Sequence, residues 1–193
     1  RKGEELPNPE DVTKRLGIPC FVKPNAGGSS FGVTKVKETE SLIKAIKKAM
    51  MESDEVMVEK MMSGTEITCG CYRRPNGEIV TFPITEVVTT QEFFDYDAKY
   101  NGKVDEITPA RIADTTAKRV SETTKRIYRL LGCYGIIRID YILTGEKDNE
   151  QINVLEINTT PGMTVTSFIP QQVRAAGLEM KDVLSDIIEG RFA

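Results

Sequence analysis

The sequence predicts an α+β fold with mixed α/β character: a small βαβ lobe, then a larger lobe of mixed and antiparallel sheet with helices. Two observations lead to this class. Near the start, two strand-like runs are followed by an amphipathic helical pattern and a third strand-like run. Later in the chain, β-rich runs are separated by turn residues, and two further helical patterns accompany them. The 193 residues are enough to bury a substantial core.

The elements of the first lobe follow in order. Residues 18–23 form a strand that ends at Pro24, and residues 32–36 form a second strand. The Gly- and Ser-rich linker at 25–31 makes this pair a hairpin with a long tip. Residues 38–52 form an amphipathic helix with apolar positions at Leu42, Ile43, Ile46 and Met50. Residues 56–61 form a third strand. The predicted first domain is 1–61.

The second predicted domain is 62–193. Turn signals at 75–77 and 145–149 separate its β-rich runs. Residues 89–110 are long, polar and aromatic without clear periodicity, which predicts a mobile functional loop. The predicted strands of this lobe are 66–73, 79–88, 134–143 and 152–157. Its predicted helices are 111–131 and 178–188.

Composition excludes several classes of protein. The net charge of −3 argues against a nucleic-acid-binding surface, and no apolar run approaches the ~20 residues that span a bilayer. The chain opens without Met in a charged stretch that does not form a signal peptide, so we expect part of a longer, cytoplasmic protein. We interpret the four cysteines as reduced core thiols. The absence of histidine excludes Ser-His and Cys-His catalysis and His-ligated metals.

The strongest polar constellation lies on the two late strands. Residues two apart on a strand face the same side, so Arg138 projects with Asp140, and Glu156 with Asn158. If these strands pair, one surface gathers two carboxylates, an amide oxygen and a guanidinium. Those oxygens suit Mg²⁺, and the guanidinium suits a developing oxyanion. The alternative is an exposed sheet face with cross-strand charge pairs, which the flanking apolar residues make weaker.

Two weaker constellations precede it. Lys23, with the Gly27–Gly32 segment, could meet a phosphate through a point charge and backbone N–H groups, although a Gly/Ser hairpin is most often only a turn. It is neither a Walker A motif nor a dinucleotide fingerprint. Glu59 and Glu66 flank the segment that passes from the first lobe to the second, and the backbone of this segment could pair with adenine. The alternative is that the two acidic residues are simply solvated, as is usual beside a turn.

In this order the three constellations resemble the ATP-grasp superfamily, and more narrowly the D-alanine–D-alanine ligases. The resemblance covers nearly all of residues 14–190. Its most specific segments are Ala98-Lys99-Tyr100 and residues 155–164, Leu-Glu-Ile-Asn-Thr-Thr-Pro-Gly-Met-Thr, closely followed by Ser167. It implies an ATP-grasp fold with the nucleotide between the lobes. The implied activity joins two D-alanines through a D-alanyl phosphate, for peptidoglycan synthesis.

The resemblance also implies roles for individual residues. Two Mg²⁺ (or Mn²⁺) ions would be held by Asp140, Glu156 and Asn158. ATP would be bound by the phosphate contacts Lys23, Gly28, Ser29 and Ser30, the adenine contacts Glu59, Lys60 and Met62, and the ribose contact Glu66. The amino-acid chemistry would use Arg138 and the Gly162 N–H as the oxyanion hole, Ser167 for the second substrate's carboxylate, Lys99 for the transferring phosphoryl group, and Tyr100 with Ser29 to close the site.

The chain departs from the family pattern in one respect. The family's N-terminal domain and another nucleotide-contacting lysine are not in this sequence, so we expect the chain to be inactive by itself. The full-length enzyme is expected to be a homodimer. Two alternatives stay open at this stage: another ATP-grasp carboxylate–amine ligase, and a nucleotide-binding module without catalysis.

Overall fold

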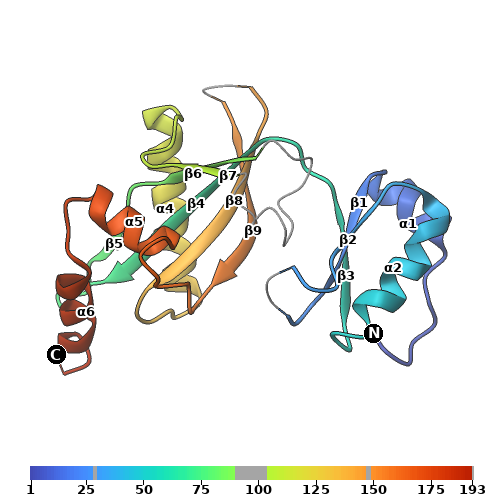
Figure 1. Ribbon diagram of the computed structural model, residues 1–193, viewed down its shortest axis with the longest axis horizontal. Helices are drawn as coiled ribbons and strands as arrows, with labels where there is room; N and C mark the ends of the chain where they lie inside the picture. Colours follow the sequence, from blue (N-terminus) through green and yellow to red (C-terminus); the bar gives the residue numbers. More distant parts are fainter. Residues whose placement is uncertain (28–29, 90–103, 147–148, 193) are drawn as a thin grey trace. The chain divides into compact units, whose positions relative to one another are not determined.

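The computed structural model describes residues 1–27, 30–89, 104–146 and 149–192 (Figure 1). The described chain divides into two compact units, residues 1–62 and the described residues from 63 onwards. Within these described ranges, no helix combines the length and apolar character needed to cross a membrane.

The first unit is a three-stranded antiparallel sheet of order β2-β1-β3 with helices on one side (Figure 1). It confirms the predicted hairpin, helix and third strand. Helix α1 was not predicted: it is eight residues long, and its half-buried face has only Pro9, Val12 and Leu16 as apolar residues. Its local signals are Pro9 at the first turn and the Asn8 cap. The elements are α1 (Pro9–Leu16), β1 (Cys20–Pro24), β2 (Thr34–Val36), η1 (Thr39–Ser41), α2 (Leu42–Ala49) and β3 (Val56–Lys60).

The two faces of this sheet differ because side chains alternate along each strand. One face packs on α2 through a core that includes Cys20, Val22 and Ile46. Lys23 lies on the opposite face of β1, and the sheet register places Glu59 opposite Phe21 on that same face. The alternation therefore brings an acidic and a basic side chain together on the face turned away from α2.

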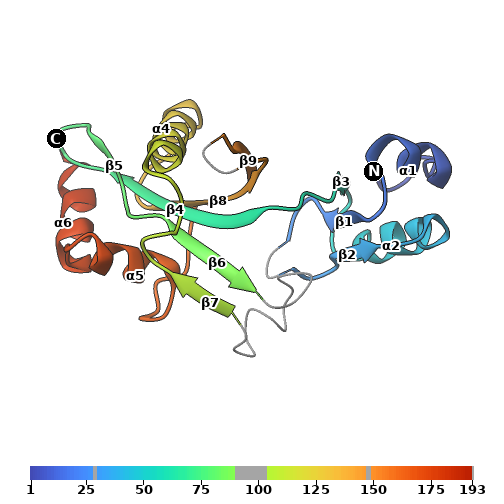
Figure 2. The same ribbon diagram turned by 90° about the horizontal axis from the view of Figure 1, so that it is seen from above.

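The second unit is a six-stranded antiparallel sheet of order β7-β6-β4-β8-β9, with β5 also paired to β4. Helix α4 covers one face, and α5 and α6 lie on the other (Figure 2). The strands are β4 (Thr65–Arg73), β5 (Ile79–Thr81), β6 (Thr85–Thr89), β7 (Val104–Ile107), β8 (Ile137–Thr144) and β9 (Gln151–Asn158). The helices are α4 (Asp114–Leu130), α5 (Phe168–Ala175) and α6 (Met180–Glu189).

Three details of this unit correct the sequence analysis. The run predicted at 79–88 is two strands, separated at Pro83, which has no N–H to donate to a ladder. The loop predicted at 89–110 contains β7 at its end, where Val104–Ile107 pairs with β6; the part at 90–103 lies outside the described residues. Helix α5 was missed because it is only eight residues long and carries Pro170 in its first turn.

All four cysteines are free, and three of them, Cys20, Cys69 and Cys71, are buried. Burial raises the pKa of the Cys69 thiol to about 12, because the thiolate would lose its hydration there. This agrees with the interpretation of the cysteines as core thiols in the reduced state.

The ion pair between Glu86 on β6 and Arg111 predicts how the stability of the protein depends on pH. Arg111 donates to both oxygens of Glu86 at 2.9 and 2.8 Å, and these hydrogen bonds hold the pKa of Glu86 below its ordinary 4.5. A lowered pKa means that the ionised carboxylate stabilises the native state above pH 4.5. That contribution is lost as the pH falls through the lowered pKa. We expect Glu86→Gln to unfold more easily than wild type at pH 7 in urea, with the difference narrowing below about pH 4.5. A difference that grows on acidification would contradict this.

Candidate active site

The described residues with predicted site roles fall into two groups, one in each unit. The first unit contains Lys23, Ser30, Glu59, Lys60 and Met62. The second contains Glu66, Arg138, Asp140, Glu156, Asn158, Gly162 and Ser167. The predicted residues Gly28, Ser29, Lys99 and Tyr100 lie outside the described residues.

In the second unit the strand register collects the predicted polar residues on one face. Arg138 on β8 lies opposite Asn158 on β9, and Asp140 lies opposite Glu156. A β-bulge is responsible for this alignment. Tyr141 pairs with Val154, so without the shift after Asp140 the regular register would set Glu156 opposite Ile139. The bulge therefore moves the carboxylate of Glu156 onto the face that carries Asp140.

Asp140 and Arg138 form the centre of this cluster. The guanidinium donates to both carboxylate oxygens of Asp140, at 2.8 and 2.7 Å, and both side chains are largely buried. Thr68 on β4 donates its hydroxyl to the same carboxylate at 2.6 Å. Glu156 lies 3.9 Å from the guanidinium and is half exposed. The bidentate pair holds Arg138 in a defined direction on the sheet.

The charge state of Arg138 follows from these neighbours. Burial lowers the pKa of Arg138, but the hydrogen bonds and charge of Asp140 outweigh this effect and hold the pKa above its ordinary value. The carboxylates of Glu156 and Glu66 act in the same direction. Phe168, the first residue of α5, lies with its ring 5.1 Å from the guanidinium carbon, a distance suited to a cation–π contact. The site thus contains a permanent cation stacked on an aromatic ring.

The predicted metal ligands lie side by side. Asn158 donates from its amide nitrogen to Asp140 and to Glu156, at 3.1 Å in each case. Rotating the amide by half a turn would present its oxygen to the same place, and two carboxylates with an amide oxygen are donors that Mg²⁺ accepts. In the described parts of the chain, no three His, Cys, Asp or Glu side chains form a metal-binding group. The donor set therefore depends on the Asn158 oxygen.

A tight turn carries the two predicted substrate contacts, Gly162 and Ser167. The Ser167 hydroxyl accepts from the Thr164 N–H at 3.1 Å, and the Ser167 N–H donates back to the Thr164 carbonyl at 2.8 Å. A Cβ on Gly162 would lie 2.9 Å from that hydroxyl oxygen. A side chain at this position would therefore displace the Ser167 hydroxyl from its place in the turn.

Helix α5 packs on the sheet through Ile169 and Val173, and its buried polar side chain, Gln172, hydrogen-bonds to the sheet. Gln172 accepts from the Gly70 N–H at 2.9 Å and donates to the Thr68 carbonyl and the Thr85 hydroxyl, each at 3.0 Å. These groups lie where β4 changes partner from β6 to β5, which leaves part of its backbone outside the ladder. Gln172 completes the hydrogen bonding of this gap and so sets the position of Ser167, which precedes α5.

The predicted residues of the first unit form a smaller polar group. The Lys23 ammonium is paired with the Glu59 carboxylate, and it lies 6.0 Å from the ring centre of Phe21. Ser30 adopts a left-handed backbone with φ of 60°. Gly32 has φ of 72°, and a Cβ there would lie 2.8 Å from Pro24. The described part of the glycine-rich segment thus requires the permissive backbone of glycine.

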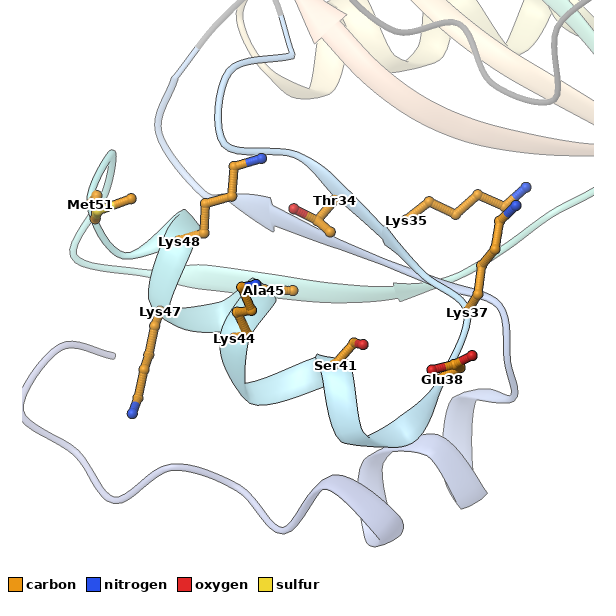
Figure 3. A pocket seen from close by; sticks show the side chains of 10 residues that line it. All are labelled: Thr34, Lys35, Lys37, Glu38, Ser41, Lys44, Ala45, Lys47, Lys48 and Met51. Carbon is orange, nitrogen blue, oxygen red and sulfur yellow. The ribbon is translucent and has the colours of Figure 1, made fainter.

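The first unit also contains a groove of about 700 Å³ beside α2 and β2, and its lining includes no predicted site residue (Figure 3). Its lining is rich in lysine: Thr34, Lys35, Lys37, Glu38, Ser41, Lys44, Ala45, Lys47, Lys48 and Met51. Nothing in its lining matches the predicted chemistry.

Sequence reasoning missed three residues of the cluster. Thr68 lies two positions after Glu66 on the same strand, so strand alternation could have found it. Phe168 follows Ser167 directly but carries no signal of its contact with Arg138. Gln172 has no local signal, because its partners are about a hundred residues away.

The comparisons with known proteins agree on one family. The family model for the D-ala D-ala ligase C-terminus matches residues 2–189. A D-alanine–D-alanine ligase from Phocaeicola vulgatus is 64% identical over 192 residues, covering 100% of this chain and 58% of that relative. The chain therefore spans a little over half the length of the curated relatives that it matches.

Solved structures show the same relationship. The D-Ala:D-Ser ligase VanG from Enterococcus faecalis has a TM-score of 0.80 at 35% identity, over 93% of this chain and 51% of that chain. A D-alanine–D-alanine ligase from Bacillus anthracis complexed with ATP has a TM-score of 0.75 at 27% identity, over 99% of this chain and 56% of that chain. They confirm the predicted α+β, ATP-grasp fold. This chain belongs to the family defined by the C-terminal part of the D-alanine–D-alanine ligases.

Proposed function

We propose that the protein containing this chain is an ATP-dependent ligase that joins two D-alanines into D-alanyl-D-alanine, for peptidoglycan synthesis in the cytoplasm. The observation that carries the proposal is the cluster on one sheet face: a guanidinium, two carboxylates and an amide, beside the turn that bears Gly162 and Ser167. Membership of the ligase family supports the same reaction.

The reaction has two steps. The carboxylate of the first D-alanine attacks the γ-phosphate of ATP, which releases ADP and leaves a D-alanyl phosphate. The amine of the second D-alanine then loses a proton, attacks the carbonyl carbon and displaces phosphate. In the second step, attack of the amine gives a tetrahedral intermediate, and negative charge develops on the carbonyl oxygen of the first D-alanine. Arg138 and the Gly162 N–H would stabilise it, and a fixed cation costs no reorganisation during the reaction.

The second substrate and the nucleotide would be held by the remaining residues. Ser167 would bind the carboxylate of the second D-alanine. Two Mg²⁺ (or Mn²⁺) ions held by Asp140, Glu156 and Asn158 would neutralise phosphate charge. The remaining contacts are assigned as in the sequence analysis: Lys23, Gly28, Ser29 and Ser30 for phosphates, Glu59, Lys60 and Met62 for adenine, Glu66 for ribose, and Lys99, Tyr100 and Ser29 for transfer and closure.

The proposal extends to the organisation of the protein. Residues 1–61 are the remainder of the central ATP-grasp lobe, and residues 62–193 are the C-terminal lobe with the metal and catalytic residues. The complete enzyme works as a homodimer, without nucleic-acid or membrane partners, and this chain alone is inactive.

The test uses the complete protein and measures ATP-dependent phosphate release with D-alanine, with L-alanine, and with D-alanine plus D-serine or D-lactate. We expect turnover with D-alanine alone and D-alanyl-D-alanine as the product. Glu156→Ala is expected to lower turnover by about 100-fold or more, because it removes a metal ligand. Glu122→Ala, on the exposed surface of α4, is the matched control and should leave turnover unchanged. A folded, ATP-binding protein without D-alanine-dependent turnover would contradict the proposal.

A further inference from the structure

The turn that bears Ser167 is held from outside by two side chains of α5. Gln171 donates from its amide nitrogen to the Thr166 carbonyl at 2.7 Å. Arg174 donates to the Val165 carbonyl at 2.9 Å. These carbonyls belong to the two residues before Ser167, so the two side chains hold the backbone of the turn at Val165 and Thr166.

Gln171 has a second partner that comes from a distant part of the chain. Its amide nitrogen also donates to the carboxylate of Glu106, 65 residues earlier on β7. Glu106 pairs with Val87, which pairs with Glu66, so Glu106 lies on the sheet face that carries the Arg138 cluster. A side chain with one amide nitrogen between two fixed acceptors loses much of its rotational freedom.

The electrostatic surroundings connect Glu106 to the same cluster. Its carboxyl is accessible to water, yet the surrounding protein removes part of its hydration, and this desolvation raises the pKa of Glu106. The hydrogen bond from Gln171 and the positive charge of Arg138 oppose that rise. Glu106 therefore lies within the field of the proposed oxyanion cation.

We propose that Glu106 is a positioning residue for the second amino-acid substrate: through Gln171 and the Thr166 carbonyl it holds Ser167 where it binds that substrate's carboxylate. The inference rests on the proposed function. Glu106 touches neither substrate nor reacting atoms in this scheme. Its effect passes through one hydrogen bond to Gln171 and a second to the turn, so it acts on the affinity for the second D-alanine and leaves the first D-alanine and ATP unaffected.

The test compares Glu106→Leu with Glu106→Gln in the complete protein. Phosphate release is followed over a wide range of D-alanine, and the curve is fitted to separate constants for the first and second molecules. Glu106→Leu should weaken the second constant about tenfold, the equivalent of one lost hydrogen bond. Glu106→Gln should stay within about threefold of wild type, because its side-chain oxygen still accepts from Gln171.

A double-mutant cycle tests the route through Gln171. Gln171→Leu should weaken the constant for the second D-alanine about as much as Glu106→Leu does. The double variant should bind the second D-alanine no more weakly than the single variant with the larger loss, because both changes break the same chain of contacts. Asp105→Leu is the matched control. It removes the same charge from the neighbouring position on β7, but Asp105 pairs with Val88 and so lies on the opposite face.

A readout that needs no turnover accompanies the kinetics. Hydrogen exchange of the peptide covering residues 162–171 should be about tenfold faster in Glu106→Leu than in wild type or Asp105→Leu, since about 1.4 kcal/mol is a factor of ten. Unchanged exchange and an unchanged second constant would overturn the inference. If the wild type shows no D-alanine-dependent turnover but Glu106→Leu still exchanges faster than wild type, the proposed function is contradicted, while the contact from Glu106 to the turn is supported. Equal changes in the constants for ATP and both D-alanines would also overturn it.

Discussion

Replacing Arg138 with alanine is expected to lower kcat for D-alanine-dependent phosphate release by about 100- to 1000-fold, as the loss of an oxyanion stabiliser does in other enzymes. The reason is geometric: the guanidinium is held by both oxygens of Asp140 and stacked on Phe168, so it offers a fixed positive charge. Single-turnover kinetics under saturating ATP and D-alanine would measure the effect on the chemical steps.

The same substitution should also destabilise the second unit. Asp140 is 8% exposed, and without Arg138 its carboxylate loses its bidentate partner in a site with little water. Breaking a largely buried ion pair costs about 3 kcal/mol. Urea unfolding would detect this loss of stability. Activity must therefore be measured without denaturant, at a temperature where the variant remains folded.

Two controls separate the proposed catalytic role of Arg138 from its contribution to folding. Arg138→Lys keeps the charge but loses the planar fork, so we expect it to recover more stability than activity. Arg111→Ala breaks a similar bidentate pair, with Glu86. Because Glu86 pairs with Ile67, whose side chain belongs to the core under α4, this pair lies on the other face of the sheet. Arg111→Ala should therefore leave kcat unchanged. Equal losses of kcat in Arg111→Ala and Arg138→Ala would show that the effect is structural.

Gln172→Leu is expected to lower the free energy of unfolding by about 3 kcal/mol or more. Gln172 is fully buried and serves three groups, the Gly70 N–H, the Thr68 carbonyl and the Thr85 hydroxyl. Leucine has a similar size but leaves all three without this partner, and an unsatisfied buried polar group costs about 1–3 kcal/mol. Urea denaturation of the second unit would measure the change.

The neighbouring position is a sensitive control for this prediction. Gln171→Leu changes the same residue type on the same helix, but the contacts of Gln171 are at the surface, so its stability should change by less than about 1 kcal/mol. Thr85→Val removes one partner of Gln172 and should fall between the two. A Gln172→Leu protein as stable as Gln171→Leu would mean that water satisfies the gap between β5 and β6.

Several elements were predictable because their signals are local. The apolar spacing of the helical run at 111–131 predicted α4, whose buried face includes Val120 and Tyr128. The turn residues at 145–149 predicted the pairing of β8 with β9. Helices α1 and α5 were not predicted: both have only eight residues, α1 has no fully buried residue, and α5 has a proline in its first turn. Strand β7 has only four residues, too few for an alternation to stand out.

By itself, the sequence determined which residues share a face, because alternation along a strand depends only on the backbone. That was sufficient to group Arg138 with Asp140, and Glu156 with Asn158. It did not determine how the two pairs align across strands. The bulge after Asp140 decides that alignment, and a bulge depends on how β9 meets β8 in the folded sheet. Only the tertiary structure placed Gln172 beside Gly70 and Gln171 beside Glu106, over separations of 102 and 65 residues. Such contacts leave no local pattern, because each becomes possible only after the sheet and α5 have packed together.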